Sequence, residues 1–276
     1  MIVKYYGVED NFCEWDYVHG VLDHLNLDDS YKMHIVSVTQ EWDYRKDVVL
    51  DKERENVIIG LADEFMTDNI PQEWKENATV FKAYLKPEQE KGSVHSFPLG
   101  YNKKHIKLPY KPVKSRQTDV FFAGHMASTN RRHYLRWVIE YFQDMKPNKR
   151  PKLDFNITKG FNLGLTGEEY SQKLHDAKIV VCPAGNVSME TFRHYEAMRS
   201  GAIIVSPKLP NTKIYKDAAI CQIEDWEDNV GDAIMDLLSD IDMLQLVQDR
   251  QQQTYNNRFT AKSVAKYINE LLPTTK

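Results

Sequence analysis

The feature that most constrains the fold is an alternation of short β-branched or aromatic runs with longer amphipathic segments of helical period. This alternation is typical of parallel sheets whose strands are joined by crossover helices. In the first part of the chain, helical stretches such as Asp16–Leu25 are expected between the strands. Five strands are expected at Ile2–Tyr6, His34–Val38, Val57–Leu61, Thr79–Tyr84 and Val94–Pro98.

A second series of the same kind follows. It predicts strands at Val120–Ala123, Leu153–Thr158, Ile179–Cys182, Ala202–Ser206 and Ala219–Ile223. It predicts helices at Thr129–Met145, Gly167–Ala177, Met189–Ser200, Trp226–Leu238 and Phe259–Leu272. Two Rossmann-like series in tandem predict an α/β protein of two lobes with a cleft between them. Open α/β sheets bind ligands outside the carboxyl ends of their strands.

The boundary between the lobes is expected in the polar segment 102–119, whose prolines at 109 and 112 disfavour helix. The segment is either an interdomain linker or an ordinary surface loop, and we prefer the linker because a new βα series follows it directly. We therefore expect an N-terminal lobe at 1–112, a C-terminal lobe at 113–258, and a C-terminal helix at 259–276 that could pack back on the N-terminal lobe.

Composition excludes several classes of protein. Hydrophobic residues make up 42% of the chain, enough for packed cores, and a formal net charge of −4 gives no reason to expect a nucleic-acid partner. Cys13, Cys182 and Cys221 are too few and too far apart for a disulfide framework or a metal cluster. The chain start lacks a signal-peptide pattern and no apolar run approaches about 18 residues, so we expect a cytoplasmic protein without a membrane span.

The strongest functional signal lies in Ile179–Val205. A buried strand ends before a loop with Pro183, Gly185 and Asn186, and a helix follows with Ser188 as its expected N-cap. Helix N-termini carry partial positive charge and unpaired N–H groups, which suit a diphosphate.

Two charged residues share a face of this helix. Arg193 would neutralise phosphate, and Glu196 would accept hydrogen bonds from two ribose hydroxyls. The alternative is an ordinary ion pair on the surface of a helix.

A second candidate site follows the strand at Val120–Ala123. Gly124 permits a close backbone approach, His125 follows it, and Ser128 or Thr129 can cap the next helix. Arg131 and Arg132 then fall in the first helical turn, where cations are unfavourable unless an anion binds nearby. The alternative is a solvated helix face.

The segment Ile179–Val205 resembles the donor-binding signature of exostosin-type glycosyltransferases. The matching residues are Pro183, Gly185, Thr191-Phe192-Arg193, Glu196-Ala197 and Gly201–Val205. Tyr170–Gly185 and Phe121–Leu135 resemble the segments around that signature in the family, while residues 1–112 resemble its acceptor lobe only loosely. The resemblance implies a GT-B fold, a UDP-sugar donor bound in the C-terminal lobe, and transfer to a sugar hydroxyl. A chain of this compactness is most similar to bacterial or large-virus members.

The chain departs from the family pattern at two points. Ala184 stands where exostosins often carry arginine, so phosphate neutralisation would fall more on Arg131, Arg132 and Arg193. The loop is also one residue longer. In retaining GT-B enzymes, seven intervening residues separate a second glutamate from the one matched by Glu196. Here that position is Ser188, which favours the inverting reading.

An inverting transfer needs a base to deprotonate the acceptor hydroxyl. Candidates are Asp16, Asp63 and Glu64 in the N-terminal lobe, and each could equally be an ordinary surface acid. The one D-x-D pattern, at 240–242, lies between apolar helical stretches and reads as a helix start or turn rather than a metal site. A mechanism without metal or other cofactor is therefore expected.

The function predicted is transfer of a sugar from a UDP-sugar to an oligosaccharide or glycoprotein glycan. The candidate sugars are xylose, GlcNAc, glucuronate and galactose. One alternative is a non-catalytic nucleotide-sugar or glycan-binding module of the same fold. Another is an epimerase or phosphotransferase, which the lack of a G-x-G-x-x-G turn and of a P-loop disfavours.

Overall fold

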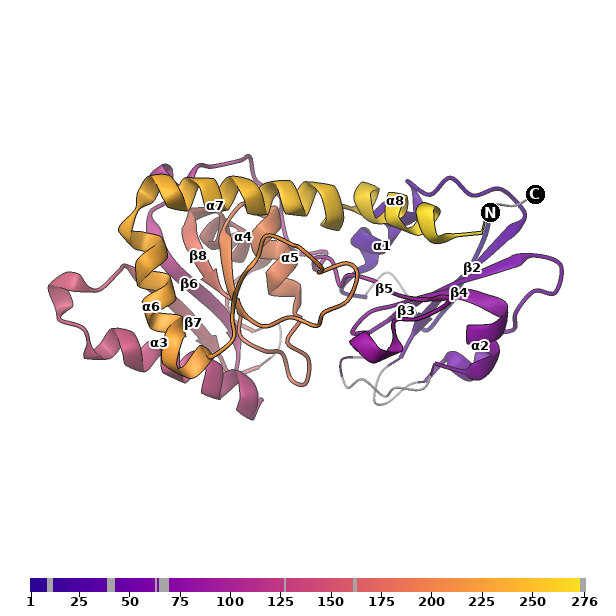
Figure 1. The fold of residues 1–276 in the computed structure, drawn as a ribbon, viewed down its shortest axis with the longest axis horizontal. Helices are drawn as coiled ribbons and strands as arrows, with labels where there is room; N and C mark the ends of the chain where they lie inside the picture. The colour runs from indigo at the N-terminus through magenta and orange to yellow at the C-terminus, as the bar shows by residue number, and fades with distance from the viewer. Residues whose placement is uncertain are drawn as a thin grey trace. The chain divides into compact units, whose positions relative to one another are not determined.

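The structure is a computed structural model that describes residues 1–8, 12–38, 43–62, 64, 70–126, 128–160 and 163–273. The chain forms two compact units, both visible in Figure 1. Unit 1 comprises Met1–Lys103, Pro210–Lys216 and Asn257–Lys276. Unit 2 comprises Lys104–Leu209 and Asp217–Asn256.

Unit 1 is built on a parallel sheet with its strands in sequence order, β1-β2-β3-β4-β5. The strands are β1 (Ile2–Tyr6), β2 (Tyr31–Ser37), β3 (Glu55–Leu61), β4 (Ala78–Lys82) and β5 (Val94–Ser96). Its helices are α1 (Trp15–Leu22), α2 (Gln72–Asn77) and α8 (Ala261–Leu271). The apolar, β-branched centres of β2 and β3 are buried on both faces, as expected of parallel strands covered on both sides.

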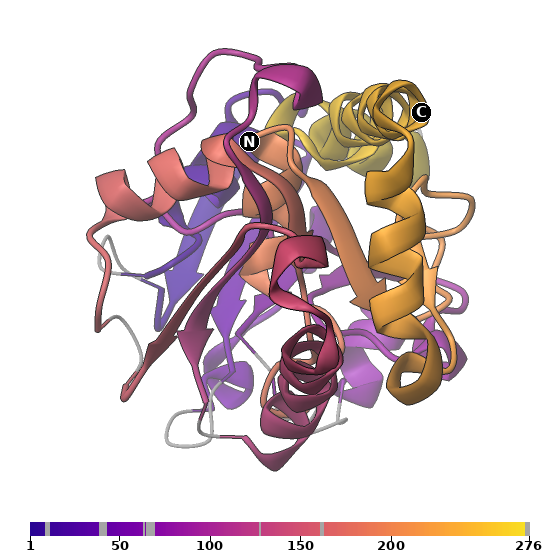
Figure 2. The ribbon, with the colours of Figure 1, turned by 90° about the vertical axis from the view of Figure 1, so that its left-hand side faces the viewer.

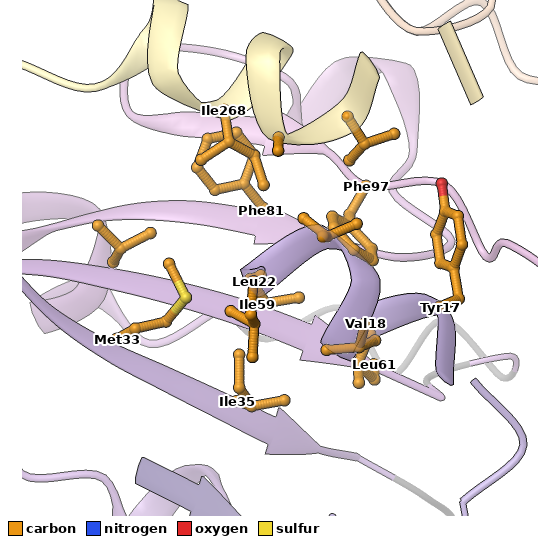
Figure 3. Close-up of a cluster of buried hydrophobic side chains, with 14 of the residues drawn as sticks. Tyr17, Val18, Leu22, Met33, Ile35, Ile59, Leu61, Phe81, Phe97 and Ile268 are labelled. Atoms are coloured by element: carbon orange, nitrogen blue, oxygen red, sulfur yellow. The ribbon is translucent and has the colours of Figure 1, made fainter. Parts of the chain in front are cut away.

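The core of unit 1 lies between the sheet and two helices from opposite ends of the chain. Figure 3 shows Ile268 of α8 beside Phe81 of β4, with Leu22 of α1 near Ile59 of β3. The hydroxyl of Tyr17 donates a 2.9 Å hydrogen bond to the carbonyl of Phe259. The C-terminal helix therefore belongs to the same packed core as the N-terminal strands.

Unit 2 holds a second parallel sheet, ordered β10-β9-β8-β6-β7. Its strands are β6 (Thr118–His125), β7 (Leu153–Thr158), β8 (Ala177–Val181), β9 (Ile203–Pro207) and β10 (Cys221–Ile223). Its helices are α3 (Thr129–Asp144), α4 (Gly167–Asp176), α5 (Phe192–Arg199), α6 (Trp226–Ser239) and α7 (Ile241–Thr254).

Helices cover both faces of this sheet. Residues of α3, α6 and α7 pack in one apolar cluster with Val120 of β6 and with alternate residues of β8 and β9. Helix α4 contacts β6 and β8 and also packs against α5. Figure 2 shows α4 (salmon) and α6 (orange) on opposite sides of the strands. The prediction of an α/β protein with two parallel sheets is confirmed.

The boundary between the units lies earlier than the predicted 112/113. Residues 104–112 belong to unit 2. Within them, Nε2 of buried His105 lies 3.0 Å from Oγ of Ser200, and the amide of Ile106 donates to Oγ of Ser171 at 2.9 Å. The segment 104–112 is therefore attached to unit 2, although its prolines and charges had suggested an interdomain linker.

The helices differ from expectation at several points. Helix α5 begins at Phe192 rather than Met189, and α1 ends at Leu22 rather than Leu25. No bounds were predicted for α2 or α7. The D-x-D pattern lies at the start of α7, where Asp240 is the N-cap and its Oδ1 accepts the amides of Asp242 and Met243. Its reading as a helix start is confirmed.

Within the described part of the chain, no helix combines the length and apolar character that crossing a membrane requires.

Candidate functional site

The site lies where the strand order of unit 2 reverses. From β6 the chain moves outward through α3 to β7, then returns through α4 to β8 on the other side of β6. The loops that leave β6 and β8 therefore lead to helices on opposite faces of the sheet. In open α/β sheets, such a switch point at the carboxyl ends of the strands is the usual place for a ligand.

Side chains join these two loops. Oγ of Ser128 donates to the carbonyl of Gly185 at 3.0 Å and also accepts the amide of Arg131, which caps α3. The Arg131 guanidinium bridges the same loops, with Nε 3.1 Å from the carbonyl of Ala184 and Nη1 2.7 Å from that of His125. Arg131 therefore organises the loops, a role that the sequence did not reveal.

Arg193 lies almost fully buried beside the end of β6, with 8% of its surface exposed. Its Nε and Nη2 donate to the carbonyl of Ala123 at 3.1 and 2.6 Å, and its guanidinium stacks over the ring of Phe122. A Cβ added to Gly124 would come within 2.4 Å of Nη2, so this glycine makes room for the guanidinium.

The third guanidinium nitrogen of Arg193, Nη1, indicates what kind of ligand the site binds. Nη1 is buried and has no hydrogen-bond partner among the described residues. A buried guanidinium N–H without an acceptor is costly, since its hydration is lost and not replaced. An anionic ligand would supply both the missing acceptor and the compensating charge.

The start of α5 is fixed by a neighbouring histidine. Thr191, not Ser188, is the N-cap, and its backbone N–H donates to Nδ1 of His194 at 3.2 Å. Nε2 of His194 therefore carries the proton, which it donates to Oγ of Ser206 at 2.8 Å. Burial, assisted by the charge of Arg193, lowers the pKa of His194 to about 3, so this histidine remains neutral.

Ser188 takes another role in the loop. Its Oγ accepts the amide of Glu190 at 3.1 Å and its carbonyl accepts the amide of Gly185 at 2.6 Å. The N-cap prediction for Ser188 is therefore wrong, because its hydroxyl closes a local turn before the helix begins.

Glu196 lies one turn into α5 and is 5% exposed. Its Oε2 accepts a 2.9 Å hydrogen bond from the hydroxyl of Tyr170 on α4. The alternative of a surface ion pair is excluded by this burial and by the separate partners of Arg193 and Glu196. Tyr170 was not among the predicted site residues.

The other predicted donor-site residues divide by exposure. Pro183 is buried, while Asn186 in the same loop is exposed. His125 is half-buried and contributes its carbonyl to Arg131. Arg132 is exposed on α3, with Nη2 3.3 Å from Oγ1 of Thr129. Arg132 thus fits the solvated-face alternative, whereas Arg131 does not.

The predicted base candidates all belong to unit 1. Asp16 is exposed in the first turn of α1, and Glu64 lies half-buried in the turn after β3. Asp63 lies outside the described residues. An acid that sequence reasoning missed is Glu14, the residue before α1, which is 3% exposed. Burial raises the pKa of Glu14 to about 8.

No group of three or more His, Cys, Asp or Glu side chains with metal-binding geometry occurs within the ranges that the structure describes. Cys13, Cys182 and Cys221 are all free thiols. Burial raises the pKa of Cys182 to about 12, and the charges of Arg193 and Glu196 also act on this thiol. This thiol is therefore inert at neutral pH.

No protein-family profile and no curated protein sequence matches this chain. Solved structures do match it in fold. A chain of the GtfA/B complex superposes with a TM-score of 0.55 at 12% identity, over 94% of this chain and 60% of that one. The present chain thus spans less than two thirds of that protein.

Two further structures are similar over most of both chains. An α-glucosyltransferase solved with UDP and a DNA 13-mer has a TM-score of 0.51 at 12% identity, covering 93% of this chain and 83% of its own. A β-glucosyltransferase solved with and without uridine diphosphoglucose has a TM-score of 0.51 at 12% identity and 98% coverage of both chains. The GT-B fold predicted from the sequence is thereby confirmed.

Proposed function

We propose that this chain is an exostosin-type glycosyltransferase that moves a sugar from a UDP-sugar to an acceptor hydroxyl. The observation that carries the proposal is the buried Nη1 of Arg193 at the switch point of the unit 2 sheet, which has no hydrogen-bond partner among the described residues. The fold supports the reaction class, and UDP or a UDP-sugar accompanies similar structures.

The diphosphate would bind at the amide end of α5. Partial positive charge at a helix N-terminus and the full charge of Arg193 both favour an anion there. The same charges would stabilise the departing UDP in the transition state, where negative charge develops. On this proposal no divalent ion is needed.

The transfer would invert the anomeric centre. The acceptor oxygen forms a bond to the anomeric carbon as the bond from that carbon to the diphosphate breaks, and the hydroxyl proton passes to a base. Ser188 occupies the position at which retaining enzymes carry a second glutamate, and its hydroxyl caps a local turn. The base is proposed among Asp16, Asp63 and Glu64, with Glu14 as a further candidate.

The donor sugar is proposed to be a pentose such as xylose or a hexose derivative, and the acceptor a glycan. Because one similar structure contains DNA with an HMU base, the acceptor panel should include DNA carrying a hydroxymethylated base. Transfer to such DNA and not to glycans would replace the glycan part of the proposal.

The proposal is tested by thermal unfolding with UDP, GDP and a panel of UDP-sugars. A ligand at 100 times its dissociation constant stabilises a protein by about 2.7 kcal/mol. We expect stabilisation by uridine nucleotides, and UDP release from one donor that an acceptor accelerates and EDTA leaves unchanged. Binding without UDP release for any acceptor would instead identify a non-catalytic module, and no stabilisation by any nucleotide would refute the proposal.

A further inference from the structure

The hydrogen bond between Tyr170 and Glu196 connects two helices of unit 2. Tyr170 lies on α4 and Glu196 on α5, and the phenolic oxygen is 2.9 Å from Oε2. This contact of the carboxylate thus depends on packing between the two helices.

Tyr170 is itself held in place by two rings. Its ring centroid lies 6.2 Å from that of Phe121 on β6 and 6.5 Å from that of His105, the latter in an edge-to-face arrangement. Burial, and then the charge of Glu196, raise the pKa of Tyr170 well above its ordinary value. The phenol therefore stays protonated, and its O–H donates a hydrogen bond to the carboxylate.

An ionised carboxylate only accepts hydrogen bonds, and its two oxygens offer about four acceptor sites. Tyr170 occupies one of these sites and restricts the rotation of the group. Tyr170 therefore contributes to the orientation of the remaining acceptor sites.

We propose that Tyr170 is a positioning residue that aims the Glu196 carboxylate at the vicinal ribose hydroxyls of the bound nucleotide. This inference rests on the proposed function. It assigns selectivity for ribonucleotides to a pair of residues, of which only Glu196 would touch the ligand.

The test compares UDP with 2′,3′-dideoxy-UDP by calorimetry, on wild type, Tyr170→Phe and Tyr195→Phe. Tyr195 is a matched control, because it is a buried tyrosine whose hydroxyl donates to another buried glutamate, Glu190. Both substitutions remove one Tyr–Glu hydrogen bond from unit 2.

Wild type should prefer UDP over its dideoxy analogue. In Tyr170→Phe we expect UDP to bind roughly tenfold more weakly, as befits a misaligned hydrogen bond to a charged group, while the dideoxy analogue binds as before. The preference should survive in Tyr195→Phe. Tyr170→Met, whose flexible side chain can refill the space, gives the same test if the phenylalanine variant does not fold.

Three results would overturn the inference. Equal weakening of both nucleotides in Tyr170→Phe would indicate a merely structural role, and unchanged affinities for both would indicate no role in binding. A wild type that binds both nucleotides equally would show that the ribose hydroxyls are not read. If wild type binds neither nucleotide, the proposed function itself fails.

Discussion

Gly124 and Arg193 fit together sterically: a Cβ on the glycine would lie 2.4 Å from Nη2 of the arginine. The end of β6 and the first turn of α5 are thus in direct contact, although 69 positions separate the two residues. Because the conflicting atom ends a long side chain, adding a methyl group would displace the guanidinium rather than the backbone.

Gly124→Ala should therefore weaken UDP binding by more than about tenfold, while overpacking costs roughly 1–3 kcal/mol of stability. Gly160→Ala is the control, since its Cβ would meet, among the residues that the structure describes, only the exposed side chain of Leu163 in the same unit. Calorimetry and thermal unfolding measure the two effects. Equal UDP affinity in Gly124→Ala and wild type would mean that the position of Arg193 does not matter for the nucleotide.

Adjacent arginines on α3 should behave differently. Arg131→Ala removes hydrogen bonds to the carbonyls of Ala184 and His125 and should lower the free energy of unfolding by about 1–3 kcal/mol. Arg132→Ala, on an exposed side chain, should change it by at most about 0.5 kcal/mol. Denaturant unfolding of both variants checks this, and similar losses in the two would contradict the structural role of Arg131.

Stability at high pH should be limited by Glu14. Its pKa rises from 4.5 in the unfolded chain to about 8 in the folded one, so the folded state holds a proton that the unfolded state has lost. The stability that this group contributes is complete below the unfolded pKa. It is lost as pH rises towards 8, at about 1.4 kcal/mol for each pH unit between the two pKa values.

Glu14→Gln removes the titration but keeps the shape, so the variant should gain stability relative to wild type as pH rises from 5 to 9. Asp16→Asn, on an exposed side chain two residues away, serves as the control substitution. Parallel curves of unfolding free energy against pH for wild type and Glu14→Gln would refute the shifted pKa.

Most of the fold could be predicted from the hydrophobic pattern of the strands. The sequence prediction was least accurate where buried polar groups form hydrogen bonds with one another. Strands β1 and β7 have the predicted bounds because their periodicity is clear. The extent of α7 beyond its predicted start was missed because its buried face carries Gln248 and Gln251, whose side-chain amides donate to the backbone carbonyls of Gly201 and Ala202. Such a face has little hydrophobic periodicity.

The candidate site was predictable only where it depends on local sequence spacing. Local spacing placed Arg193 and Glu196 on one helix face and Gly124 at a strand end. It did not reveal Tyr170, because the partnership with Glu196 depends on how α4 packs against α5. Nor did it separate Arg131 from Arg132, since only the tertiary structure brings the Pro183–Ser188 loop beside one of them.

At low pH the buried histidines of unit 2 should destabilise the fold. The pKa of His105, like that of His194, is lowered to about 3, in both cases first by burial and then by a neighbouring arginine. Between pH 6.5 and 3 the two histidines bind protons in the unfolded state but not in the folded state. The free energy of unfolding therefore falls as pH decreases from 6.5 towards 3. His105→Gln should flatten this fall, and an acid transition as steep as that of wild type would contradict the assignment.

The proposed role of Arg193 in binding the diphosphate is tested most directly by the affinity of Arg193→Met for UDP. This affinity is measured by calorimetry beside wild type and Arg136→Met. Methionine can fill the buried space without charge or donors, and Arg136 is an exposed arginine on α3 paired with Glu140. We predict that Arg193→Met stays folded and binds UDP at least about tenfold more weakly, while Arg136→Met binds normally. Undiminished UDP affinity in a folded Arg193→Met would contradict the proposal that Arg193 binds the diphosphate.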